Sequence, residues 1–188
     1  MVTGSGIPLK EKCVKALANH VLRDHVLIGA LAALAVLPFL GTGGSLVFWI
    51  STVMVDSDHY LDYLVRTRLK HPGIRPMFLF HEELFNRRHR EEFLALEIFH
   101  TVEFMVLFAG VAFWGGGLLP SIFWGIAFHM AVDFVHGARY GILSKRSHSF
   151  IQYFWRRKQF LAQGKDPEAV FAEALRAAGG TADGTETL

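Results

Sequence analysis

Two long runs without charged side chains restrict most strongly how this chain can fold. The first extends from Val26 to Val55, and the second from Phe104 to Val132, where His129 is the only titratable side chain. A helix that crosses a bilayer needs about 20 consecutive, mostly apolar residues. Each run is too long for one such helix and slightly short for two. If each run forms two helices, those helices must extend into the residues that flank the run.

A glycine-rich break lies in the middle of each run, GTGG at residues 41–44 and GGGLLP at residues 115–120. Glycine clusters and proline interrupt helices, so each run is predicted to form a helical hairpin. The sequence therefore predicts an all-α, polytopic membrane protein with a four-transmembrane-helix bundle, made of two hairpins, in residues 1–140. The expected spans cover about residues 18–40, 45–66, 92–114 and 119–139. A soluble all-α protein can also be rich in Phe and Leu, but uncharged runs of this length are rare in water-soluble helices.

The distribution of basic residues predicts the orientation of the four spans. Both glycine-rich turns lack Lys and Arg, whereas the N-terminal segment, the connection between the hairpins and the C-terminal part are basic. Basic segments beside membrane helices mark the cytoplasmic side, so both termini are expected in the cytoplasm. No signal peptide is evident, and the expected location is a bacterial-type inner (cytoplasmic) membrane. The basic segments are expected to bind anionic lipid headgroups of the bilayer rather than nucleic acid.

Residues 141–180 are predicted to form a cytoplasmic, amphipathic helical extension. The stretch SFIQYFWRRKQFL, residues 149–161, is typical of a helix on the membrane surface and equally of an amphipathic helix packed on the bundle. The stretch DPEAVFAEALRAAGG predicts a short helix with Asp166 as its N-cap and Pro167 at its first position. The tail, residues 181–188, is predicted to be disordered.

His and carboxylate side chains recur at the predicted cytoplasmic ends of all four spans. Asp56 and His59, like Glu97 and His100, are three residues apart, a spacing that makes side chains neighbours on a helix. Four distant segments thus bring ionisable groups to one membrane depth. The predicted metal ligands are His25, Asp56, His59, Glu97, His100, His129, Asp133 and His136.

A metal cluster would explain why so many acids lie at the ends of apolar helices. A charge at the bilayer centre costs at least about 2.5–3.5 kcal/mol, which divalent ions bound by carboxylates and neutral imidazoles would offset. Asp58 and Glu103 are the general-base candidates, acting through a bound water. The alternatives are that a single His serves as a hydrogen-bond donor between helices, that Asp58 or Asp62 is solvated at the headgroups, and that Glu103 relays protons. His81 can fold back over the site, and the single Cys excludes a cysteine-rich zinc module.

These motifs resemble the YdjM-like predicted membrane-bound metal-dependent hydrolases. That family has an early His, a P-D-x-D-H motif, an H-R…T-H-S segment and a final H-x-x-x-D. Here DHVLIGA supplies the early His and VDSDH the second motif, with Val55 in place of Pro, while FHTVEF and FHMAVD supply His100 and the last pair. The H-R and T-x-S parts are missing, and His136 is additional. The resemblance covers about residues 20–140.

The resemblance implies phosphoester hydrolysis, because this family is grouped with zinc phospholipase C and related zinc nucleases. The expected cofactors are two or three divalent ions, zinc first, with iron or manganese as alternatives, and the expected substrate is a phospholipid or another phosphoester. A membrane di-iron redox enzyme is a second hypothesis, from the carboxylate-x-x-His spacings. A non-enzymatic metal or proton conduit is a third. The oligomeric state is left open.

Overall fold

Helices account for most of the chain, as the sequence predicts. The computed structural model describes residues 9–179, and the side chains of residues 25–179. The helices are α1 (Leu9–Met54), α2 (Ser57–Arg66), α3 (Ile74–Asn86), α4 (Val102–Gly115), α5 (Leu119–Arg139), α6 (Phe150–Ala162) and α7 (Pro167–Ala177). Two-residue strands, β1 (Ala95–Leu96) and β2 (Arg146–Ser147), pair in parallel. The predicted disordered tail, residues 181–188, lies outside the described residues.

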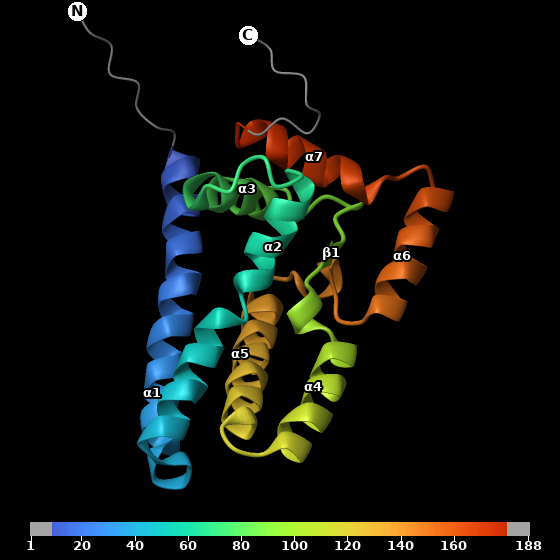
Figure 1. Ribbon diagram of the computed structural model, residues 1–188. Coiled ribbons are helices and arrows are strands. Elements are labelled where there is room, and N and C mark those ends of the chain that lie inside the picture. The colour runs from blue at the N-terminus through green and yellow to red at the C-terminus, as the bar shows by residue number, and fades with distance from the viewer. Residues whose placement is uncertain (1–8, 180–188) are drawn as a thin grey trace, which may run out of the picture.

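The first hairpin is α1 itself, which doubles back at Gly41 (Figure 1). Gly41 has φ 65° and ψ 176°, a conformation that is essentially restricted to glycine. The two limbs of α1 pack against each other, with Trp49 Nε1 donating to the Val26 carbonyl oxygen at 3.1 Å. The break predicted at residues 41–44 is thus confirmed. The turn between α4 and α5 lies at the same end of the molecule as the Gly41 turn (Figure 1).

The predicted second span, residues 45–66, is wrong as one continuous helix. The helix stops at Met54, Val55 and Asp56 form a turn, and α2 starts at Ser57. Residues two apart on a regular helix point to different sides. The turn lets both Asp56 and Asp58 face the histidines described below.

The predicted third span, residues 92–114, is wrong over its first ten residues. Those residues form β1 and a 3-10 turn (Ile98–His100), and α4 begins at Val102 with Thr101 as its N-cap. Pairing of β1 with β2 and the bond from Val102 N to the His148 carbonyl oxygen (2.8 Å) hold this segment outside a helix. The 14 residues of α4 give about 21 Å of helix, less than a hydrocarbon core of about 30 Å.

The helix α5 has the bounds predicted for the fourth span, residues 119–139. Judged by length and composition, the described residues contain one helical segment long and apolar enough to cross a membrane. It is His25–Arg66, 42 residues, and it includes the Gly41 turn and the break at Asp56. The mostly helical fold is confirmed, whereas the four-span membrane bundle stays a prediction.

A cluster of buried hydrophobic side chains lies beyond the hairpins, in the upper part of Figure 1, where α7 packs on α3. Its buried side chains come from α2, α3, the segment before β1, and α7: Tyr63, Phe80, Leu84, Phe93, Val170, Phe171, Ala174 and Leu175. Arg66 ties α2 to α7 by binding Glu168 at 2.8 Å and stacking on Phe171 at 3.8 Å. The predicted N-cap residue of α7 is confirmed, because the Asp166 side chain accepts a hydrogen bond from Glu168 N. We call α3, α7 and the end of α2 the cap.

Candidate metal centre

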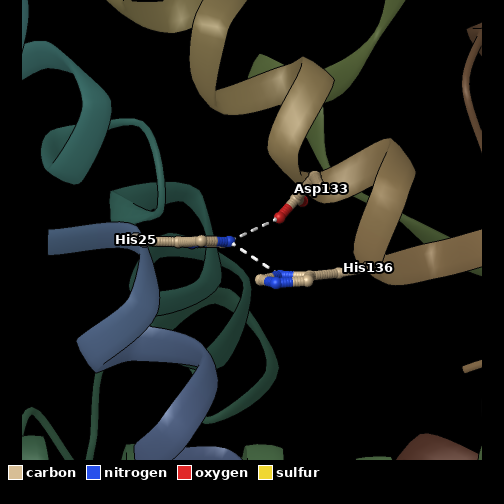
Figure 2. Close-up of side chains that lie close together, drawn as sticks. All are labelled: His25, Asp133 and His136. Carbon is tan, nitrogen blue, oxygen red and sulfur yellow. Dashed lines mark hydrogen bonds and ion pairs between the residues drawn. The ribbon is translucent and has the colours of Figure 1, made fainter. Parts of the chain in front are cut away.

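The predicted ligands gather where the two hairpins meet the cap. His25 comes from the first limb of α1, Asp56 from the turn before α2, His59 from α2, and Glu97 and His100 from the segment before α4. The remaining three lie along α5, whose spacing of i, i+4 and i+7 turns them toward α1: His129, Asp133 and His136. Figure 2 shows His25 on α1 facing Asp133 and His136 on α5.

Three overlapping groups of side chains have the geometry to hold a metal ion. They are His25, Asp133 and His136; His25, Asp56 and His129; and His100, His129 and Asp133. In each group the nitrogen and oxygen atoms lie within 4.8 Å of one another. Three residues each belong to two groups: His25, His129 and Asp133. Of these, the Asp133 carboxylate has two oxygens and can bridge neighbouring ions, whereas each imidazole nitrogen can bind only one.

The closest approaches within these groups join atoms that carry lone pairs. His25 Nε2 lies 3.2 Å from Asp133 Oδ1 and 3.2 Å from His136 Nδ1 (Figure 2). His129 Nε2 lies 3.3 Å from Asp56 Oδ1 and 3.2 Å from His100 Nε2. Such atoms attract one another only through a shared proton or a cation.

His129 is oriented in the way that a metal ligand requires. Its Nδ1 donates to the Thr52 carbonyl oxygen at 2.7 Å, and a carbonyl can only accept. In the neutral ring, Nε2 therefore keeps its lone pair and points it at the Asp56 carboxylate. A metal-binding histidine typically has this arrangement, with its other nitrogen bound to a backbone carbonyl or a carboxylate.

His100 is oriented in the same way by a carboxylate. Its Nδ1 donates to Asp58 Oδ2 at 2.9 Å, and the same oxygen accepts from Phe99 N at 3.1 Å. His100 and Asp58 are both buried. This geometry favours a role for Asp58 in orienting His100 over the predicted role as general base.

His25 provides a further test of whether a metal fits. The residue is 6% exposed, and its Nδ1 has no hydrogen-bond partner, with Asp56 Oδ2 3.6 Å away. A buried, unsatisfied ring nitrogen is costly. An ion between His25 and Asp56 would satisfy both, so the residues present fit a metal.

The remaining predicted residues lie at the edge of these groups or outside them. His59 lies 3.6 Å from both Asp56 and Glu97, bordering the three groups. Glu103 accepts from Ser149 Oγ at 2.6 Å and belongs to none of the groups found among the described residues. Asp62 binds Arg66 on its own helix at 2.8 Å.

Arg146 is the site residue that sequence reasoning missed. Its Nη1 donates to Asp133 Oδ2 at 2.8 Å, and its other terminal nitrogen pairs with Glu97. Burial lowers the pKa of the guanidinium, and the charges of Asp56 and Asp58 oppose that shift. In the sequence, Arg146 is one of many C-terminal basic residues, and only the pairing of β1 with β2 places it here.

His81 folds back over the site, as the sequence suggested it can. Its Nε2 donates to the His59 carbonyl oxygen at 2.9 Å, and the two rings lie 5.0 Å apart. Burial lowers the pKa of His81 to about 3, so the ring is neutral at pH 7. It contacts the site through both the backbone and the ring of His59.

Comparison with protein-family models, with curated proteins and with solved structures gives no match. The resemblance to the YdjM-like hydrolases therefore stays a prediction based on short motifs.

Proposed function

We propose that this protein is a membrane-embedded, metal-dependent hydrolase that cleaves a phosphoester, of a lipid-like substrate, at the cytoplasmic face. The observation that carries the proposal is the set of three overlapping ligand groups, in which imidazole nitrogens face carboxylate oxygens. Four segments far apart in the sequence contribute to them, and two of the histidines are held by bonds from their second ring nitrogen.

The donor set supports zinc first, because imidazole nitrogen and carboxylate oxygen are common zinc ligands, while iron or manganese also accept them. In our proposal two or three ions are held by the members of the three groups, with His59 and Glu97 at the edge: His25, Asp56, His100, His129, Asp133 and His136. The bound ions would polarise the phosphoryl oxygens and lower the pKa of a bound water. Hydrolysis adds that water's oxygen to phosphorus while the ester P–O bond breaks, and a proton passes to the leaving oxygen.

The apolar surface of the hairpins supports a membrane setting. Large side chains on both hairpins are strongly exposed, among them Leu31 (67%), Phe39 (85%), Leu107 (71%) and Trp114 (95%). Large exposed apolar surfaces mark contact with a protein partner or a membrane. With the four spans as proposed, both glycine-rich turns face outward and the metal centre lies near the cytoplasmic surface.

The di-iron hypothesis loses support at Glu97 and His100. In di-iron bundles the carboxylate-x-x-His pair projects from one helix. Here Glu97 is extended, with φ −115° and ψ 118°, and His100 ends a 3-10 turn. The conduit hypothesis loses support because the hairpin ends around Gly41 and Gly116 contain no ionisable side chain. A pocket at one membrane face fits these observations better than a path across the membrane.

Elemental analysis of the detergent-purified protein tests the proposal directly. We expect about two or three zinc ions per chain. His129→Ala should lose most of the metal, because His129 belongs to two of the three ligand groups, and it should abolish phosphate release from phospholipid substrates. His89→Ala, the same change at an exposed position, is the matched control.

A metal content near zero in the parent protein would refute the metal centre. A full metal content in His129→Ala would refute the ligand assignment. Visible absorbance from bound iron, without phosphoester cleavage, would instead favour a redox enzyme.

A further inference from the structure

A pocket lies directly beside the candidate metal centre, between α5 and the connection from α5 to α6. Its polar lining consists of His100, Asp133, Arg146 and His148, and its apolar lining includes Met130 and Phe134. The ligand residues His100 and Asp133 form part of its wall, so a molecule in the pocket would lie against the bound ions. The apolar wall is accessible from outside, since Phe134 is 59% exposed.

The position of Arg146 in this pocket is fixed by its backbone. Arg146 pairs with Ala95 in the β1–β2 bridge, which holds it next to the segment that carries Glu97. From the other side, Arg156 on α6 donates to the carbonyl oxygens of Arg146 (3.2 Å) and Ser144 (2.6 Å). A connection held from two sides presents the guanidinium at a set distance from the metal ligands.

The present partners of Arg146 are residues that a metal would use. Asp133 belongs to two of the three ligand groups, and Glu97 borders them. When a bound divalent ion neutralises a carboxylate, that carboxylate attracts a guanidinium less strongly. Metal binding would therefore weaken both ion pairs and leave N–H donors of Arg146 available at the edge of the pocket.

We propose that Arg146 binds the anionic phosphoryl group of the substrate once the metal ions occupy their ligands. A guanidinium presents a planar fork of N–H donors that matches two oxygens of a phosphate. The apolar wall of the pocket would then take the hydrophobic part of the same substrate. This inference rests on the proposed function, and it names the residue that would recognise the charged group of the phosphoester.

Inorganic phosphate is the probe that tests this role without relying on turnover. Its affinity for the zinc-loaded, detergent-purified protein can be measured by titration calorimetry. We expect Arg146→Gln to weaken phosphate binding by about 10- to 100-fold, the range for losing a charge-assisted hydrogen bond. Arg146→Lys should lose less phosphate affinity than Arg146→Gln, because lysine keeps the positive charge but lacks the planar fork of donors. Both variants should keep the metal content of the parent, because Arg146 supplies no ligand atom.

The matched control is Arg139→Gln, which makes the same charge change at an exposed position at the end of α5. Its phosphate affinity should equal that of the parent. Unchanged phosphate affinity in both Arg146 variants at full metal content would overturn the inference and leave the proposed function standing. Failure of the zinc-loaded parent to bind phosphate would likewise overturn the inference and leave the proposed function standing. A parent protein without metal would overturn the proposed function and the inference together. If Arg146→Gln does not fold, the phosphate affinity of Arg146→Lys alone tests the inference.

Discussion

Asp58 belongs to none of the ligand groups found among the described residues, but it contacts His100, which belongs to one of them. One of its oxygens accepts from both His100 Nδ1 and Phe99 N. Its charge would raise the basicity of the His100 ring and fix its orientation. Asp58 is therefore a positioning residue, and its replacement should weaken zinc binding less than the loss of a ligand does.

We expect Asp58→Asn to weaken zinc binding by about 10- to 100-fold, the usual cost of losing such a supporting carboxylate. The asparagine oxygen still accepts from His100, but its negative charge is gone. Competition with a chelator of known affinity measures the effect. Asp62→Asn, the same change one helical turn later, should have no effect, because Asp62 pairs with Arg66.

Two other outcomes would contradict this assignment for Asp58. A loss of zinc as complete as in His100→Ala would make Asp58 a ligand. Full zinc affinity with abolished hydrolysis would restore the general-base role that the sequence suggested.

The ligand set was predictable at the residue scale, and its supporting residues were not. His25, His129 and Asp133 stand out because ionisable side chains are rare in apolar helices. Thr52 contributes a backbone carbonyl to His129, and any residue type supplies that group. Arg146 becomes a site residue through strand pairing across about 50 positions, which leaves no periodic signal in the sequence.

At the scale of elements, the approach of α5 to α1 determines whether the centre forms. A Cβ added at Gly125 would lie 2.4 Å from the Phe48 carbonyl oxygen, so only glycine fits this contact. His129 lies one turn further along α5 and reaches the Thr52 carbonyl on α1. Small residues at such crossings let membrane helices pack closely.

We therefore expect Gly125→Ala to lower the thermal unfolding midpoint and the zinc affinity together, because α5 must move away from α1. Thermal unfolding in detergent and chelator competition measure the two effects. Gly110→Ala on α4 is the matched control, since nothing lies within 4 Å of an added Cβ there. Alanine favours a helix by about 1 kcal/mol over glycine, so the control should not lower the midpoint. An equal loss in both variants would contradict the packing argument.

The helix bounds were predictable where local signals decide them. Uncharged runs and glycine clusters predict both hairpins, and α5 has the predicted bounds. The break at Asp56 and the extended segment before α4 depend on distant partners. Asp58 meets Phe99 N, and β1 pairs with β2, so tertiary contacts override the helical pattern at both places.

At the scale of the whole molecule, the two hairpin turns and the cap lie at opposite ends (Figure 1). Both hairpin turns lack Lys and Arg, whereas the connections beside the cap carry many of them. With the proposed membrane setting, this asymmetry orients the protein by the positive-inside rule.

Cysteine labelling tests that orientation. In a Cys13→Ser background, Gly43→Cys at the hairpin turn should react with a membrane-impermeant maleimide added to intact spheroplasts. Lys158→Cys, exposed on α6, should react only after permeabilisation. Labelling of both positions from the same side would contradict the four-span arrangement.

The short bridge between β1 and β2 has a consequence for how the length of this chain can vary. It fixes where Glu97 and Arg146 stand relative to each other, and His100 follows β1 by only four residues. An insertion or deletion between Leu96 and His100 would shift His100 relative to the bridge and to Arg146. One between Ser147 and the start of α6 would shift Arg156 relative to the carbonyl oxygen of Arg146. The turns at Gly41 and Gly116 lie at the end of the molecule opposite the cap and contain no ionisable side chain, so we expect lengthening to be tolerated there (Figure 1).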